Sequence, residues 1–415
     1  MNVLERAECL LDAGSSGNMN FTVIATYGGR FEAIALQRSL ITLQAEHQLL
    51  RSSLVWDGHH CCFAPCAAPV PVTLQPWPDE LAPETAGQAW KPAAMATLRQ
   101  RFSGGGEPLW RITWLKGTEG GELLLTFHHA IADGLSAMAL VQRLFSLLAA
   151  EAAGEIPDPQ PDWDGFTPDL ARSFARPRPA AAAASELPDR QDVGLSTSYG
   201  FEQVSTSGSR ALLAWTRQRG LRLNATLHAA FLQALVASDV LPAQTIATTV
   251  VNLRPLAAPA LPWELMRLLR VCVDTPITVD PEAPLERLAA ELHGELQRQL
   301  QQEVPLQALD AIAAALDDGP SPQQFWRRCR RQGGLITNLG RVPVAAHHGA
   351  LSLQRLFFVA NVEPVVMPDQ PLVVLGALSF NDQLTLTSFQ IEQQLDDHGA
   401  AAVLADMKQR LMAVV

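Results

Sequence analysis

Residues Leu123-Leu124-Leu125-Thr126-Phe127-His128-His129-Ala130-Ile131-Ala132-Asp133-Gly134 run from an apolar segment into two histidines, then to an aspartate and a glycine. The apolar run predicts a strand that ends at the histidines. The Ala- and Leu-rich segment that follows, Leu135 to Ala153, predicts a helix. A strand that delivers polar side chains to its end, directly before a helix, is a common rigid support for chemistry.

The two histidines are expected to play different parts. If the strand continues through His129, its successive side chains point to opposite faces, so His128 and His129 cannot both serve one site. A metal centre built from these two and Asp133 would need all three to converge, so no metal is expected here. The pattern favours one histidine acting alone as a base, because the imidazole pKa lies near neutral pH.

Length and charge narrow the class of protein. The chain has 415 residues, which suits two domains, and 48% of them are hydrophobic, enough for a large core. The formal net charge is -11, and no basic block stands out, so nucleic acid is an unexpected partner. The N-terminus lacks an apolar signal region, and no uninterrupted apolar run is long enough to span a bilayer. We expect a cytoplasmic protein without a transmembrane segment.

The six cysteines, at 9, 61, 62, 66, 272 and 329, are expected to be reduced in that compartment. The cluster from His59 to Cys66 could be considered for zinc, but no second ligand pair with finger-like spacing follows it. A hairpin explains the cluster better: Ser53 to Trp56 form one strand, Asp57-Gly58 the turn, and His59 onward the return strand.

The rest of the chain alternates between predicted strands and helices. Strands are expected at 20–27, 70–74, 109–115, 122–128, 201–207, 245–252, 271–275, 334–340, 372–380 and 383–389. Helices are expected at 31–49, 93–101, 135–153, 210–219, 285–303 and 400–415. Another helix, with Asn224 or Thr226 as its N-cap, should end at Ala237.

The pattern His-His-x-x-x-Asp-Gly at residues 128–134 resembles the signature of an acyltransferase superfamily. Its members include chloramphenicol acetyltransferase, the condensation domains of nonribosomal peptide synthetases, and the free-standing polyketide-associated and alcohol acetyltransferases. Two later segments extend the resemblance. Asn252-Leu253-Arg254 is similar to a family segment whose arginine pairs with the signature aspartate. Thr337-Asn338-Leu339-Gly340 resembles a turn near the acyl-donor channel, which makes Asn338 and Gly340 candidate channel residues.

The resemblance implies an α/β fold of two chloramphenicol-acetyltransferase-like sandwich halves, arranged as a pseudo-dimer with the active site in a tunnel between them. The N-terminal half would cover residues 1–155 and carry the signature. Residues 156–193, which are rich in proline and alanine, would form a linker or surface arm. Residues 194–415 would form the C-terminal half. His347-His348 lacks a following Asp-Gly, so no second site is expected there.

The resemblance also assigns roles to the candidate site residues. His129 would act as the general base. Asp133 would point away from the pocket and pair with Arg254, His128 would pack, and Gly134 would allow the tight turn into the helix. An acceptor would attack a thioester carbonyl directly. No bound cofactor is expected, and the co-substrate would be acyl-CoA or a phosphopantetheinyl acyl carrier protein.

These features predict an enzyme of secondary metabolism that transfers an acyl group to a hydroxyl of a small-molecule, lipid or polyketide acceptor, with N-acyl transfer possible. One alternative is a stand-alone condensation enzyme that forms an amide with a carrier-bound amine. Another is a catalytically silent module that docks carrier proteins, although an intact His129 and Asp133 weigh against it.

Overall fold

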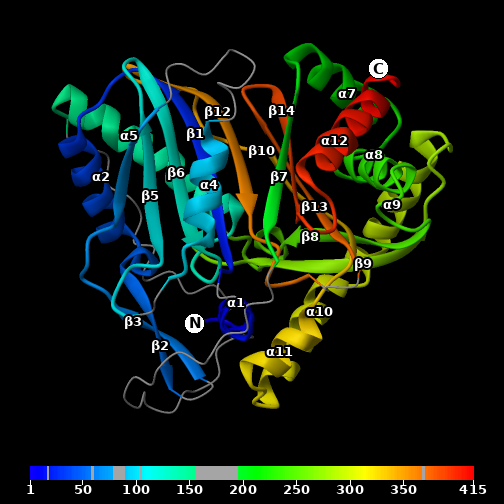
Figure 1. Cartoon of the computed structure of the whole chain (residues 1–415), viewed down its shortest axis with the longest axis horizontal. Coiled ribbons are helices and arrows are strands. Elements are labelled where there is room, and N and C mark those ends of the chain that lie inside the picture. The colour runs from blue at the N-terminus through cyan, green and yellow to red at the C-terminus, as the bar shows by residue number, and fades with distance from the viewer. Residues whose placement is uncertain (16–17, 58–59, 78–88, 103–104, 156–194, 367–369) are drawn as a thin grey trace.

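The computed structural model describes the chain except for residues 16–17, 58–59, 78–88, 103–104, 156–194 and 367–369. Two six-stranded sheets stand side by side, each with helices on its outer face (Figure 1). The molecule thus has the expected fold of two α/β sandwich halves. The expected linker at 156–193 lies outside the described residues.

The first sheet has the order β11-β12-β1-β6-β5-β4. All its neighbours run antiparallel except β4 and β5, which are parallel. The helices α2 (Ala33–Glu46) and α5 (Gly134–Ala153) lie on the outer side, and α4 (Trp90–Arg99) lies on the side that faces the other half. The strands are β1 (Asn20–Gly28), β4 (Val72–Pro76), β5 (Trp110–Lys116), β6 (Gly120–His128), β11 (His347–His348) and β12 (Leu351–Ala360).

The second sheet has the order β7-β14-β13-β10-β8-β9, and β10 runs parallel to both of its neighbours. Its strands are β7 (Thr197–Val204), β8 (Gln244–Asn252), β9 (Arg270–Thr278), β10 (Gly333–Arg341), β13 (Leu372–Phe380) and β14 (Gln383–Ile391). Its helices are α7 (Thr206–Gln218), α8 (Leu223–Ala237), α9 (Leu285–Gln301) and α12 (Asp397–Met412).

The two halves are interlocked because β12 comes late in the sequence but pairs with β1 in the first sheet. Phe357 of β12 shows how tightly this strand is held. Its ring lies 4.9 Å from Trp90 of α4 and 4.9 Å from Phe201 of β7. A strand from beyond residue 194 therefore completes the sheet that carries the signature, and its side chains join both halves. The sequence analysis predicted no strand at the position of β12.

A further group of short elements lies beneath the two sheets in Figure 1. Three helices, α1 (Val3–Gly14), α10 (Val304–Asp317) and α11 (Pro322–Cys329), pack together, and α10 also contacts β9. The two strands of the expected hairpin are present as β2 (Ser52–Asp57) and β3 (His60–Pro65), whereas Gly58 of the expected turn and His59 after it lie outside the described residues. The 3-10 turns η1 (Gln48–Arg51) and η2 (Arg254–Leu256) complete the described elements.

Several boundaries differ from those predicted. The helix that was to run to residue 49 ends at Glu46, and η1 follows it. Neither Asn224 nor Thr226 caps α8, which begins at Leu223 after Arg222 without a side-chain cap. The β13–β14 turn is as expected. Asn381 and Asp382 both adopt positive φ, as a two-residue turn of this kind requires.

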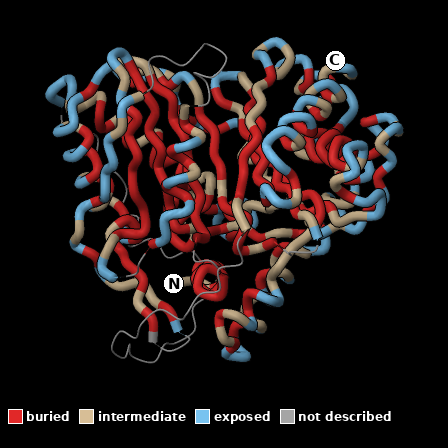
Figure 2. Tube along the Cα trace, viewed as in Figure 1, coloured by how far each residue is buried: buried red, intermediate tan, exposed pale blue. Residues whose placement is uncertain are grey.

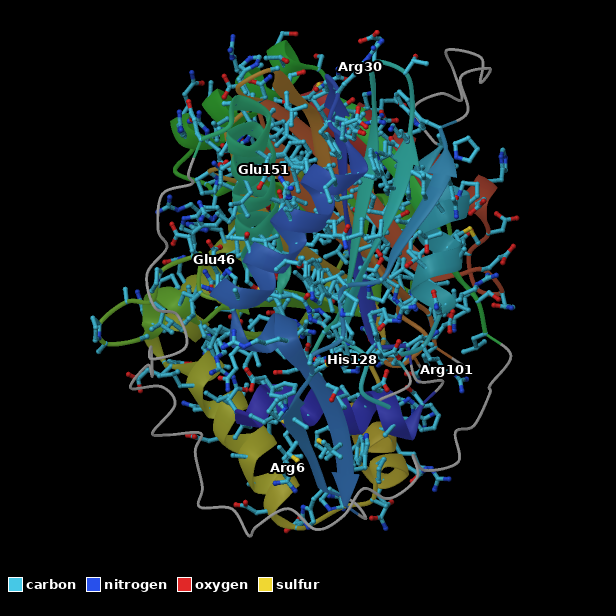
Figure 3. All side chains as sticks on the ribbon, turned by 90° about the vertical axis from the view of Figure 1, so that its left-hand side faces the viewer. Arg6, Arg30, Glu46, Arg101, His128 and Glu151 are labelled. Atoms are coloured by element: carbon cyan, nitrogen blue, oxygen red, sulfur yellow. The ribbon has the colours of Figure 1, made fainter. Side chains whose placement is uncertain are left out.

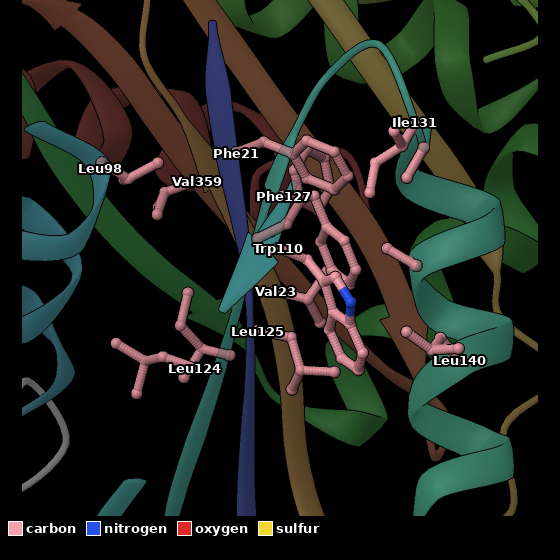
Figure 4. Close-up of a cluster of buried hydrophobic side chains, with 14 of the residues drawn as sticks. Phe21, Val23, Leu98, Trp110, Leu124, Leu125, Phe127, Ile131, Leu140 and Val359 are labelled. Atoms are coloured by element: carbon pink, nitrogen blue, oxygen red, sulfur yellow. The ribbon is translucent and has the colours of Figure 1, made fainter. Parts of the chain in front are cut away.

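An aromatic column leads through the first half towards the signature turn. The Trp110 and Phe127 rings are parallel with centroids 5.9 Å apart, and Phe127 stacks on Phe21 at 5.4 Å. These rings fill the side of the sheet that faces α5, whereas Leu124 lies on the other side with Leu98 and Val359 (Figure 4). The central strands β1, β6, β13 and β14 are buried along nearly their whole length (Figure 2). The base of the signature turn therefore rests on tightly packed rings.

Among the described residues one helix, α5, is long and apolar enough to cross a membrane. More than half of its apolar window, 56%, is buried inside the protein, and it packs against α2 and the first sheet. The apolar character of α5 is thus accounted for by the core of the first half.

Phe357→Ala should destabilise the protein by roughly 3–5 kcal/mol, because it removes a buried ring that touches both halves. The measurement is the free energy of unfolding from urea titration followed by circular dichroism. Ile41→Ala is the matched control, since Ile41 is 55% exposed on α2 and its loss should stay within about 0.5 kcal/mol. Equal effects of the two changes would contradict the interlocked arrangement.

Candidate active site

A cavity of about 240 Å³ lies between the two sheets, where the signature turn meets the second half. Its walls come from β1, the turn after β6, β8, β9, β10 and β12. The lining is largely apolar, with a few polar groups that converge on it. They include His129, Asp133, Asn252, Arg254, Arg270, Arg331, Thr337, Asn338 and Asn361.

His129 is fixed by its neighbours at the cavity wall. β6 ends at His128, so His129 is the first residue of the turn, and its N–H donates to the Met19 carbonyl oxygen at 2.8 Å. Its ring lies 4.7 Å from Phe21, at the end of the aromatic column. Nδ1 is 2.9 Å from the Ala132 carbonyl oxygen, which can only accept. Nδ1 therefore carries the proton, and Nε2 is the unprotonated nitrogen of the neutral ring.

His128 points to the other side of the sheet and is 1% exposed. Its Nδ1 accepts the N–H of Ala130 at 3.1 Å, so Nε2 carries the proton and faces Asp12 Oδ1 at 3.5 Å. Figure 3 places His128 just above α1, the helix that supplies Asp12. His128 does not line the cavity. The side chains of His128 and His129 thus point to opposite faces, as the sequence predicted, although the strand ends at His128.

The protein holds His129 in its neutral form. Burial is the main cause and lowers the pKa of His129 to about 4, and the positive charge of Arg270 acts in the same direction. Glu8, Asp133 and the Ala132 carbonyl oppose this shift without cancelling it. At neutral pH the ring is therefore available to accept a proton.

Asp133 and Arg254, the pair expected from the sequence, are in contact. Arg254 Nη1 donates to Asp133 Oδ2 at 2.6 Å, and the two residues are 2% and 5% exposed. The same carboxylate oxygen accepts the N–H of Leu269 at 3.0 Å. Arg254 Nη2 donates to the carbonyl oxygens of Leu265 and Arg267, at 3.0 and 3.2 Å. The pair therefore joins the turn after β6 to the segment between β8 and β9.

The second carboxylate oxygen of Asp133 begins the helix. Oδ1 accepts the N–H of Ser136 at 3.0 Å, and Ser136 Oγ in turn accepts the N–H of Asp133 at 3.0 Å, a reciprocal cap on α5. Burial alone raises the pKa of the Asp133 carboxyl, but Arg254 and the N–H donors outweigh it and hold the pKa below its ordinary value. Asp133 is thus a buried carboxylate with both oxygens bound.

Gly134 has a different role from the one expected. It starts α5 and is not among the glycines with positive φ, so the turn itself does not require glycine. A Cβ at this position would lie 2.8 Å from the Leu339 side chain of β10. The absence of a side chain at Gly134 therefore lets the second half approach the signature turn closely.

The two channel candidates behave differently. Asn338 lines the cavity, and its Oδ1 accepts the N–H of Gly340 at 2.8 Å, so the Nδ2 donor end is the one left for the cavity. Gly340 is not among the lining residues. Its φ of +69° is the reason for glycine there, since it turns the chain back to the Asn338 side chain.

The sequence reading missed three groups at this site. Asp12 Oδ1 accepts the N–H of Met19 at 3.0 Å, and the Met19 carbonyl holds His129, so Asp12 supports the base from behind. Arg270 and Arg331 line the cavity. One signal for α1 was available: Glu5, Glu8 and Asp12 recur at helical spacing within an apolar stretch, and all three are buried.

Comparison with known families covers most of the chain. The condensation domain family matches residues 9–166, and the C-terminal domain of phthiocerol/phthiodiolone dimycocerosyl transferases matches residues 200–389. The catalytic domain of wax ester synthase/diacylglycerol acyltransferases matches residues 93–254. A search of curated proteins found no match.

Solved structures show the same fold at low identity. Polyketide synthase associated protein 5 from Mycobacterium tuberculosis is 18% identical, with a TM-score of 0.66 over 98% of this chain and 96% of that one. A trichothecene 15-O-acetyltransferase from Fusarium sporotrichioides is 13% identical, with a TM-score of 0.69 over 100% and 94%. The first condensation domain of the calcium-dependent antibiotic synthetase is 13% identical, with a TM-score of 0.66 over 98% and 94%.

The family matches indicate an acyltransferase of the condensation type. The chain belongs to the superfamily of condensation domains and chloramphenicol-acetyltransferase-like acyltransferases, with two pseudo-dimeric halves.

Asp133→Ala and Arg254→Ala should each lower the free energy of unfolding by about 3–5 kcal/mol, because each change leaves a buried charge without its partner. The double variant should lose less than the sum of the two. Urea unfolding of all four proteins gives the coupling energy. Additive losses would show that the pair does not join the halves energetically.

Proposed function

We propose that this protein transfers an acyl group from a thioester to a hydroxyl acceptor by direct attack, with His129 as the general base. The observation that carries the proposal is the fixed tautomer of His129. Its Nδ1 is bound to the Ala132 carbonyl, which leaves an unprotonated Nε2 on a ring at the wall of an apolar cavity. A base needs a free nitrogen in a defined position, and the Phe21 ring and the Met19 carbonyl hold it there.

The reaction balances without a protein nucleophile. The acceptor oxygen attacks the thioester carbonyl carbon while His129 Nε2 takes the hydroxyl proton. The tetrahedral intermediate then breaks its C–S bond, and the leaving thiolate recovers that proton as a thiol. The Nδ2 group of Asn338 is the donor we assign to the substrate carbonyl, because its Oδ1 is already bound to Gly340.

Asp133 has no part in proton transfer under this proposal, because both of its oxygens are occupied in the network with Arg254, Leu269 and Ser136. It is a positioning residue that holds the start of α5 and the second half in place. The donor would be acyl-CoA or an acyl carrier protein, which is a co-substrate, so the reaction needs no resident cofactor. A carrier-bound amine as acceptor, giving an amide, is the second candidate.

His129→Ala should lower acyl transfer by a factor of about 10²–10⁴ with little change in melting temperature. The assay incubates purified protein with acetyl, butyryl and octanoyl donors, on CoA or on an acyl carrier protein, and a panel of alcohols and amines. It records thiol release and product mass. His128→Ala is the matched control and should mainly lower stability, because His128 is buried against α1. Normal turnover in His129→Ala, or no transfer by the wild type to any acceptor with CoA or carrier-bound donors, would refute the proposal.

The low pKa of His129 sets the expected pH profile. Its neutral form persists as pH falls from 7 to the value of about 4, so kcat/KM should stay level to about pH 5 and fall only below that. The unfolded state binds this proton near pH 6.5, so the contribution of His129 to folding stability should decline as pH falls between about 6.5 and 4. Measuring kcat/KM from pH 4 to 9 checks the first point, and an acid limb near 6.5 would contradict it.

A further inference from the structure

We propose that Arg270 and Arg331 form a binding position for a carboxylate or phosphate group on one of the two substrates, next to the reacting centre. This inference rests on the proposed function in that it names the chemical class of substrate for the same site. Its observations are separate from those that identify His129 as the base.

The two arginines lie where two cavities meet. The cavity at His129 and a second one of about 460 Å³ are both lined by Met19, Arg270, Cys272, Arg331 and Val365. The second cavity is bounded by α1, β9 and the end of α11, on the lower side of the molecule in Figure 1. A substrate that extends from the cavity at His129 into the second cavity would therefore pass beside both arginines.

Both guanidinium groups keep hydrogen-bond donors for a ligand. Arg270 Nη2 donates to Glu8 Oε1 at 2.9 Å, and its Nη1 lies 3.9 Å from Cys272 Sγ. Arg331 uses Nη1 for both oxygens of Asp274, at 3.0 and 3.2 Å. A guanidinium has five N–H donors, so these contacts leave several of them for an anion. Glu8 and Asp274 hold the two arginine side chains in place and use only some of their N–H donors.

The charge of this region is opposite to that of the chain. The second cavity is lined by four arginines, Arg270, Arg328, Arg330 and Arg331, and by two carboxylates, Glu8 and Asp274, so its lining carries a net charge of +2. The whole chain carries -11. The Arg270–Glu8 pair joins β9 to α1, the Arg331–Asp274 pair lies within the second half, and Arg328 is 3.8 Å from Asp318 outside this lining. Arg330 is therefore the arginine that these pairs leave in excess. A positive lining within a negative protein selects an anionic group.

The position of Arg270 indicates which part of a substrate would carry the anion. The positive charge of Arg270 helps to lower the pKa of His129, although burial contributes more to that shift. In a CoA or carrier-bound donor, the pantetheine arm separates the thioester from the phosphates. A cation beside the base therefore faces the acyl group or the acceptor, and a hydroxy acid or a dicarboxylyl donor supplies the required charge.

The test uses two matched pairs of probes that differ by one charge. For the acceptor, 3-hydroxyoctanoate is compared with its methyl ester, and for the donor, succinyl-CoA is compared with butyryl-CoA. Binding to the wild type and to Arg331→Gln is measured by calorimetry, and kcat/KM is measured where turnover occurs. We expect the charged member of one pair to lose about 10-fold or more in affinity in Arg331→Gln relative to its neutral partner. Which pair responds tells whether acceptor or donor carries the anion.

Two further variants guard against an effect of folding. Glu8→Gln combined with Arg270→Gln removes the second arginine without stranding Glu8, which is 6% exposed, and should give the same charge-selective loss. Arg219→Gln, which breaks a surface ion pair with Glu286, is the control and should leave both pairs unchanged. Equal losses for charged and neutral probes, or no loss in either pair, would overturn the inference. Because binding is measured directly, the inference about the two arginines is tested even if no acyl transfer is found.

Discussion

The buried carboxylate of Asp133 is the constraint on which the arrangement of the site depends. A charge of this kind is tolerated in a protein interior only when it is paired and hydrogen-bonded, and both oxygens of Asp133 are. Its partners are Ser136 of α5, Arg254 of η2 and Leu269, the residue before β9. One group thereby fixes the signature turn, the entry to the helix and the edge of the second sheet relative to one another. All three segments contribute residues to the lining of the cavity at His129.

The local features of the site could be predicted from the sequence because they depend on neighbouring residues. The apolar run, the two histidines and the following helix fix the alternation that separates His128 from His129, whether or not the strand extends by one residue. The contact between Asp133 and Arg254 spans 121 positions, and only the family resemblance suggested it. The role of Gly134 was misjudged for the same reason, since its neighbour Leu339 belongs to the distant strand β10.

The elements that the sequence did not reveal are those whose partners lie far away. β12 has the composition of an ordinary buried strand, and nothing local indicates that it pairs with β1 instead of joining the second sheet. The helix α1 carries three buried acids, which look like a solvated face until Arg267, Arg270 and His128 are placed against them. Distant partners therefore determine both the pairing of β12 and the burial of the acids on α1, and local propensity does not reveal either of them.

The environment of His129 combines two requirements that oppose each other. Burial and Arg270 keep the ring neutral, which suits a base, but a low pKa also makes that base weak. An anionic group bound at Arg270 and Arg331 would offset the charge that acts on His129, so the base would become stronger only when the substrate is in place. The same ion would also occupy the passage between the two cavities and exclude water from it. Where the acceptor carries this anion, water that reaches a bound thioester before the acceptor would meet the weaker base, and the thioester would be protected from hydrolysis.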